Sequence, residues 1–332
     1  MCFRAVAGLL AVAFVCAACG GSTGAGRDDA EKLQVVTTVS PITNLVANIG
    51  GDAVEVRGVV PEGSNSHTFE PPPSTARLLA DADVVYVNGL ELEVPTVRLA
   101  RENRSDDAEI VFLGERTLDP DAYIYDFSFP RSGGKPNPHL WTHPLLALRY
   151  AEIVAGDLSE RDPDNAEVFE TNLAALTARL RAFDTGLRSA SDTIPPEQRK
   201  LLTYHDSFAY FAADYGWTVV GAIQPSDFDE PTPRDVAKLI DQIRTESVPA
   251  IFGSEVFPSP VLAQIGKEAD VRYVDTLRDD DLPGKPGDPD HSLLGLLQAD
   301  YVTIVDALGG DASALESVDV ANVARDTARY PQ

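Results

Sequence analysis

Sulfur-containing residues are scarce in this chain. Its 332 residues include one methionine and three cysteines, and the cysteines are Cys2, Cys16 and Cys19. The part of the chain beyond residue 19 therefore has no cysteine, which excludes a disulfide framework and a thiolate metal site there. Any metal in that part would need histidine, aspartate or glutamate as its ligands.

Basic residues are also few. Lysine and arginine number 27 against 52 aspartates and glutamates, so the formal net charge is -25. Nucleic acids and anionic lipid surfaces attract basic patches, so this balance argues against both as partners. We expect the excess of acid to form a solvated surface that keeps the protein soluble.

A long apolar run is missing. The first apolar stretch, residues 5–15, is too short to cross a bilayer as a stable anchor. With Arg4 before it and small residues before Cys19, it predicts a signal peptide over residues 1–18. The letters CAAC resemble a bacterial lipobox, which implies lipidation of Cys19, although Cys16 stands where leucine is usual. A secreted protein with incidental cysteines is the alternative.

The residues after Cys19 are rich in glycine, serine and charge, so we expect a flexible tether over residues 19–32. The whole chain, with 332 residues and 44% hydrophobic content, is long enough for two domains with cores of their own. Short Val- and Ile-rich runs alternate with helical patterns, which is typical of parallel sheets in α/β folds. The predicted strands are residues 33–39, 53–60, 83–88 and 109–114 in the first half, and 200–204, 218–223, 250–255 and 271–276 in the second.

A different pattern separates the two halves. Between residues 164 and 191, apolar residues recur at steps of four and three, which predicts one helix long enough to join two lobes. These residues are Phe169, Leu173, Leu176, Leu180, Phe183 and Leu187. We therefore predict an α/β fold with an N-terminal lobe over residues 33–163, a linking helix over 164–191 and a C-terminal lobe over 192–332. Each lobe is expected to contain a parallel sheet of roughly four strands.

Three of the five histidines follow predicted strands. His67 comes after the second strand, His139 after the fourth, and His205 directly ends the first strand of the second half. Ligands of open parallel sheets bind at the carboxyl ends of the strands. Asp275 and Glu255 end strands of the second half in the same way, so either could add a carboxylate. Three imidazoles and a carboxylate would suit a first-row divalent metal.

Several local patterns carry a family resemblance. Six segments resemble, in the same order, motifs of the metal-binding lipoproteins of bacterial ABC importers for zinc and manganese: HTFEPPPS, NGLELE, NPHLWTHP, YHDSFAYFAADYG, AIFGSEVF and YVDTL. The chain from about residue 33 to residue 308 is similar to this family of solute-binding proteins, also called cluster A-I or cluster 9. Departures are His143, where an aspartate is usual, Thr142 in place of leucine, and Val94 and Pro95 where an aromatic residue often follows.

The resemblance implies that His67, His139, His205 and Asp275 are metal ligands and that the helix over 164–191 is a rigid spine. It implies an extracytoplasmic lipoprotein that is anchored to the cell membrane and delivers a divalent metal to an ABC permease. We expect zinc before manganese because imidazole nitrogens favour zinc, while a carboxylate leaves manganese and iron open. A monomer is expected, no catalysis is expected, and a role in cell adhesion stays open.

Other polar residues near the predicted site have minor expected roles. Glu255 and Asp206 are expected to support ligand imidazoles, and Glu255 could also bind the metal directly. His143 lies beside Pro144, so a helix cap or an exposed position is expected for it. His291 is likewise expected to be a cap or a surface residue.

Two other functions use the same residues. Three histidines and a carboxylate could activate water in a zinc hydrolase, but the chain lacks the His-Glu-x-x-His spacing of zincins. A binder of an organic or siderophore-like ligand on the same fold would need an apolar cleft lined by several aromatics. Phe69, Trp141 and Phe208 flank the candidate ligands singly, which is more typical of a dry shell around a metal.

Overall fold

The structure is a computed structural model that describes residues 32–224, 231–254 and 259–331. The predicted signal peptide, Cys19 and nearly all of the predicted tether lie outside the described residues, as does Glu255.

Two parallel sheets of four strands form the framework of the described residues. The first has the order β2-β1-β3-β4 and the second the order β6-β5-β7-β8. The strands are Leu33–Thr37 (β1), Val54–Gly58 (β2), Val84–Val87 (β3), Glu109–Phe112 (β4), Lys200–Thr203 (β5), Thr218–Ala222 (β6), Ala250–Ser254 (β7) and Arg272–Leu277 (β8). All eight predicted strands are confirmed, and the two halves share one strand order.

Helices cover the sheets, and this explains why the central strand β3 is apolar throughout. All four residues of β3 are buried, as expected for a strand with both faces covered. The helices are Ser40–Gly50 (α1), Thr75–Ala80 (α2), Val94–Asn103 (α3), Leu113–Thr117 (α4), Pro144–Arg161 (α5), Ala166–Asp192 (α6), Ala209–Tyr215 (α7), Pro233–Glu246 (α8), Pro260–Ala269 (α9), Leu293–Ala307 (α10) and Ser313–Glu316 (α11).

The serines at the beginning of α1 and α2 do not cap these helices with their side chains. Ser40 is the first residue of α1 and its Oγ donates a hydrogen bond to the backbone oxygen of Asp280. Ser74 precedes α2 but makes no side-chain cap bond. Ser40 therefore links two distant parts of the chain instead of capping its own helix.

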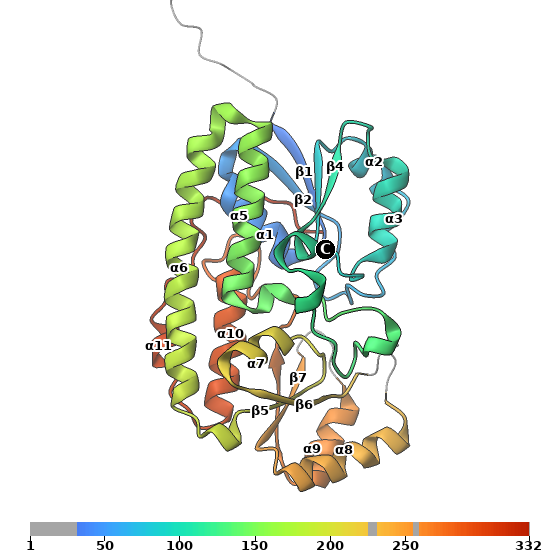
Figure 1. Ribbon diagram of the computed structural model, residues 1–332, viewed down its shortest axis with the longest axis vertical. Helices are drawn as coiled ribbons and strands as arrows, with labels where there is room; N and C mark the ends of the chain where they lie inside the picture. Colours follow the sequence, from blue (N-terminus) through green and yellow to red (C-terminus); the bar gives the residue numbers. More distant parts are fainter. Residues whose placement is uncertain (1–31, 225–230, 255–258, 332) are drawn as a thin grey trace, which may run out of the picture. The chain divides into compact units, whose positions relative to one another are not determined.

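Helix α6 is the predicted spine. It runs for 27 residues and, in Figure 1, passes alongside both sheets. It packs against α1, α5, α10 and α11. One hydrophobic core joins Val35 of β1, Phe183 of α6 and Leu201 of β5. The two-lobe α/β fold with a long linking helix is thus confirmed, and the lobes share core residues along the helix.

The C-terminal segment returns to the first sheet. The backbone N–H of Arg329 donates to Val56, and that of Gly58 donates to Arg329, beside the edge strand β2. In Figure 1 the C-terminus lies near β2 of the first sheet, although the second sheet comes between them in the sequence. The predicted boundaries of the two lobes remain a prediction.

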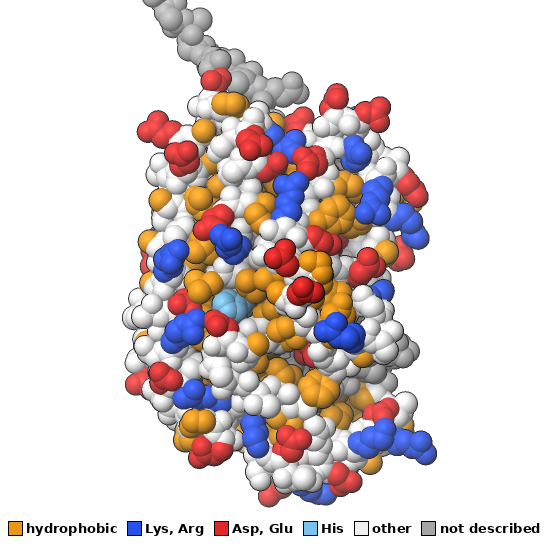
Figure 2. Space-filling view, viewed as in Figure 1, with side chains coloured by type: hydrophobic (Ala, Val, Ile, Leu, Met, Phe, Trp, Pro, Cys, Tyr) orange, Lys and Arg blue, Asp and Glu red, His pale blue; other side chains and the backbone are white. Residues whose placement is uncertain are grey.

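The surface has the mixed charge expected from composition. In Figure 2 acidic side chains are dispersed among lysines and arginines, and apolar side chains gather across the middle of the view. Within the part of the chain that the structure describes, no helix has both the length and the apolar character needed to cross a membrane.

Replacing Phe183 should weaken the fold strongly. Its side chain is fully buried on α6 and its ring lies 6.1 Å from that of Tyr301. Phe183→Ala should lower the free energy of unfolding by about 3–5 kcal/mol because a cavity replaces the ring. Val168→Ala, at a 42% exposed position of the same helix, should cost less than about 0.5 kcal/mol. Urea titration of both variants measures this, and equal midpoints would contradict the role assigned to α6.

Candidate metal centre

Three histidines from distant parts of the chain meet between the two sheets. His67 lies in the loop after β2, His139 precedes a short 3-10 turn after β4, and His205 follows β5. One ring nitrogen from each lies within 4.8 Å of the other two. The Nε2 of His139 is 2.8 Å from the Nε2 of His205 and 3.2 Å from that of His67. The strand ends therefore bring together all three predicted histidines.

The cluster is largely shielded from water. His139 is fully buried and His205 is 2% exposed, whereas His67 is half-buried. Burial, followed by the charges of His205 and Lys135, holds the pKa of His67 well below its usual value. Burial, followed by the charges of His205 and His67, does the same for the pKa of His139. These two imidazoles are therefore neutral near pH 7 and can offer lone pairs to a metal.

An amide fixes the tautomer of His139. The Nδ2 of Asn137 donates to the Asp206 backbone oxygen and to Oδ2 of Asp126, which fixes the orientation of the amide. Its Oδ1 then faces the Nδ1 of His139 at 2.8 Å. An amide oxygen can only accept, so His139 carries its proton on Nδ1. The Nε2 atom that points into the cluster is left with a lone pair.

A second amide acts in the same way on His205. Oε1 of Gln224 lies 2.9 Å from Nδ1 of His205, which places the proton on that nitrogen. The Nε2 atoms of His139 and His205 thus face each other across 2.8 Å. With Nδ1 of each ring bound to an amide oxygen, Nε2 is the nitrogen that each ring can offer to a metal. Such amide partners are typical of the ligands that hold a metal.

A buried carboxylate lies beside the cluster. Oδ1 of Asp280 lies 4.0 Å from Nε2 of His139 and has no hydrogen-bond partner among the described residues, although only 3% of the residue is exposed. Oδ2 accepts a hydrogen bond from Ser66. Burial raises the pKa of Asp280, and the charge of His205 opposes this shift. A buried carboxylate oxygen without a donor is costly alone, so its place beside the imidazoles is consistent with a cation.

Asp275 is not part of this cluster. It is exposed within β8, and the group of possible metal ligands found among the described residues contains only the three histidines. The strand continues to Leu277, two residues beyond Asp275, and the chain turns only afterwards. Asp279 adopts a left-handed φ of 56° in that turn, directly before Asp280. The signal that sequence reasoning missed is the run of three acids at 279–281 just past the strand.

Asp206 lies behind the cluster. It is buried, its Oδ2 accepts a hydrogen bond from the backbone N–H of Ser128, and its backbone oxygen accepts one from Asn137. It therefore supports His139 through its backbone and Asn137. Its predicted action through the carboxylate on a ligand ring remains a prediction.

The two remaining histidines have separate surroundings. Nδ1 of His143 accepts a hydrogen bond from Leu145 at the start of α5, so the predicted cap is confirmed. His291 is fully buried, with Nε2 3.4 Å from Oε1 of Glu62, and the expected surface position is wrong. Ser292, not His291, caps α10 by accepting from Gly295.

The chain is similar to a known protein family and to several of its members. Residues 35–307 match the family model described as zinc-uptake complex component A, periplasmic. The manganese-binding lipoprotein MntA of Halalkalibacterium halodurans is 33% identical over 252 residues, which cover 76% of this chain and 80% of the relative. The iron-binding protein YfeA of Yersinia pestis is 30% identical over 282 residues, covering 85% and 88%.

A solved structure is also similar. The periplasmic zinc binding protein TroA from Treponema pallidum superposes with a TM-score of 0.76 at 25% identity and covers 84% of this chain and 99% of its own. The three similar proteins are named for manganese, iron and zinc respectively, so their names do not agree on one metal.

Removing the amide behind His205 should weaken metal binding. Gln224→Leu keeps the bulk of the side chain but lacks an acceptor for Nδ1, so the dissociation constant should rise by about 10–100-fold. Gln242→Leu is the matched control, because that amide donates to Val220 in the same lobe and does not contact the histidines. Competition against a chromogenic chelator measures both. A Gln224→Leu constant within twofold of the parent value would refute the role of the amide.

Proposed function

The chain belongs to the family of the periplasmic component A of zinc-uptake complexes, and from this we propose that it captures a zinc ion and delivers it to an ABC permease. The coarser function is that of a metal-binding component of an ABC importer, not of an enzyme. One observation carries the proposal for the site: three imidazoles, two of them with Nδ1 bound to an amide oxygen, converge beside a buried carboxylate.

The proposed ligands are His67, His139, His205 and Asp280. Zinc sites of this kind have four ligands in a tetrahedron with Zn–N bonds of about 2.0–2.1 Å, which separates the ligand atoms by about 3.3 Å. The Nε2 atoms of the cluster are 2.8 and 3.2 Å apart, so small displacements of the rings would admit the ion. Asp280 takes the place that the sequence assigned to Asp275, because its carboxylate is the one beside the histidines.

The donor set supports zinc over manganese and iron. Imidazole nitrogens bind zinc more tightly than manganese or iron in the usual order of stability, and three of the four proposed ligands are imidazoles. Manganese and iron prefer more oxygen ligands and higher coordination numbers. The close packing of the three rings supports a low coordination number. Manganese is our second choice.

The partner and the location follow from the same proposal. We propose that Cys19 carries the lipid that anchors the protein outside the cytoplasm, where a membrane permease receives the metal. The protein would act as a monomer, with one metal site between its two sheets. The unbroken helix α6 favours a small movement of the lobes on metal binding rather than a wide hinge.

Metal content tests the proposed cargo. Protein that starts at Gly20 is stripped of metal and reloaded with zinc and manganese in equal amounts. The parent should retain one zinc per chain, and His205→Ala should lose it because a ligand and its lone pair are gone. His143→Ala, which removes a cap outside the cluster, should retain it. Bound manganese would overturn the choice of metal, and no bound metal in the parent would overturn the function.

The fourth ligand has a test of its own. Asp280→Asn keeps the shape of the side chain but removes its charge, so the dissociation constant for zinc should rise by more than about tenfold. Asp275→Asn, at an exposed position of β8, should bind zinc as the parent does. Calorimetric titration distinguishes the two residues. The reverse order of effects would restore Asp275 as the ligand.

A further inference from the structure

A cavity of about 640 Å³ opens onto His67. We refer to it as the vestibule. Three segments form it, namely the loop from His67 to Glu70, the beginning of α3 with the turn before it, and the loop over residues 128–136. At about 30 Å³ for each water, six waters around a divalent ion occupy roughly 180 Å³. A fully hydrated metal ion therefore has room in the vestibule.

Of the three clustered histidines, only His67 lines the vestibule. It is half-buried, whereas His139 and His205 lie behind it with almost no exposure. The ring of Phe129 also lines the vestibule and stands 5.5 Å from His67 and 5.6 Å from His139, measured between ring centres. An ion that moves from the vestibule to the cluster would therefore pass His67 and the edge of Phe129 first.

The walls of the vestibule carry charges of both signs. Glu70 and Glu91 are exposed acids, and Arg98 lies 3.8 Å from Glu70. Lys135 is exposed and lines the same space. It is close enough to His67 that, after burial and His205, its charge contributes to the lowered pKa of that ring. A positive charge in front of a cation site opposes the approach of the cation, so Lys135 and the two acids act in opposite directions.

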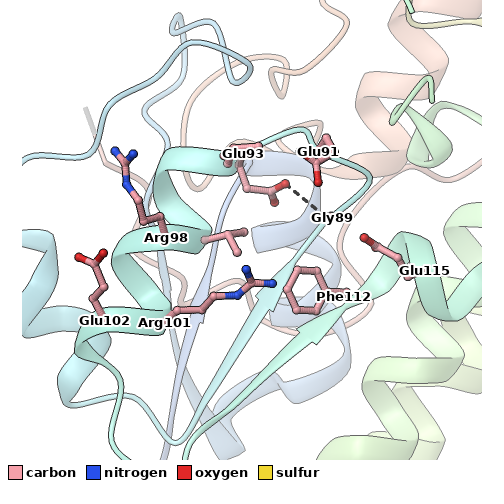
Figure 3. A pocket seen from close by; sticks show the side chains of 10 residues that line it. Gly89, Glu91, Glu93, Arg98, Arg101, Glu102, Phe112 and Glu115 are labelled. Carbon is pink, nitrogen blue, oxygen red and sulfur yellow. Dashed lines mark hydrogen bonds between the residues drawn. The ribbon is translucent and has the colours of Figure 1, made fainter. Parts of the chain in front are cut away.

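The position of Glu91 depends on a strained turn. Leu90 and Glu91 have φ values of 52° and 63°, a left-handed conformation that costs energy for residues with a side chain. Carboxylates hold this turn, since Glu93 accepts from the backbone N–H of Gly89 and Glu115 accepts from that of Leu90. Figure 3 shows Glu91 and Glu93 at this turn, with the bond from Gly89 to Glu93 drawn as a dashed line.

Strain of this kind is retained where it places a group for function. Glu91 lines both the vestibule and the neighbouring cavity of about 390 Å³ that Figure 3 shows, so its carboxylate lies at the border between them. Glu102, on the same helix as Arg98, lines the neighbouring cavity but not the vestibule. The turn thus places an acid on the wall of the same cavity that His67 lines.

We propose that the divalent metal enters and leaves the three-histidine cluster through the vestibule, with Glu70 and Glu91 attracting the hydrated ion, Lys135 slowing it, and His67 as the first ligand that it meets. The proposal rests on the proposed function, since it needs a metal site at the histidines. It adds a path and names residues that set the rate of capture without being ligands.

Blocking the vestibule tests the path. The chain beyond residue 19 has no cysteine, so Ser132→Cys in protein that starts at Gly20 has a single thiol at an exposed position of the vestibule wall. A bulky maleimide on this thiol should slow zinc association and dissociation alike, each by about tenfold or more, and leave the dissociation constant unchanged. Ser189→Cys, exposed on α6 and treated with the same reagent, is the control and should bind zinc at the parent rate.

Charge variants test the roles of the acids and the lysine. In stopped-flow mixing at low salt, Glu91→Gln and Glu70→Gln should each lower the association rate by about threefold, and Lys135→Gln should raise it by a similar factor. The differences should shrink at 1 M salt, where charges are screened. Glu102→Gln and Lys238→Gln, at exposed positions outside the vestibule, should leave the rate unchanged.

The outcomes separate this proposal from the proposed function. A parent protein that binds neither zinc nor manganese would overturn the function and the path together. One bound zinc with equal loading rates in the labelled and unlabelled Ser132→Cys protein would overturn the path alone. Rates that respond to the label but not to the charges would overturn the roles of Glu70, Glu91 and Lys135.

Discussion

The contact between the Nε2 atoms of His139 and His205 is the interaction on which the site depends. Each of the two imidazoles has its Nδ1 bound to an amide oxygen, so the two Nε2 atoms face each other at 2.8 Å. Burial keeps water away from them and lowers the pKa of His139. The fold therefore holds two ring nitrogens where one cation could bind both.

The shared core explains how such an arrangement can persist. The facing groups come from the carboxyl ends of two different sheets, and neither sheet alone could hold them together. Helix α6 packs beside both sheets and its buried residues belong to a core that includes β1 and β5. Polar contacts reinforce this link near the site, as Ser40 of α1 and Ser66 beside His67 both bond to Asp280 of the second lobe.

The proposed ligands differ in how far they are shielded from solvent, so the site has a buried side and a side that faces a cavity. Asn137 and Gln224 hold the deep imidazoles, whereas His67 lies at the wall of a cavity with charged residues around it. In our proposal the deep part selects the ion and the outer part governs how quickly the ion arrives. Such a division would account for the strained turn that carries Glu91, an acid that is not a proposed ligand.

The sequence by itself determined the fold class. Short apolar strands and an amphipathic helix of about 25 residues can be recognised from the spacing of apolar residues that are close together in the sequence. It also identified the three clustered histidines, since the loops that follow parallel strands meet at one edge of a sheet. The carboxylate proposed as the fourth ligand was found only in the tertiary structure. Whether Asp275 or Asp280 reaches the histidines depends on where β8 ends and how the chain turns at Asp279. The two residues are only five positions apart, and the periodicity of the sequence does not locate a strand end that closely. The amide partners, the buried His291 and the vestibule likewise arise from residues distant in sequence, whose contacts exist only once the two sheets pack on a common helix.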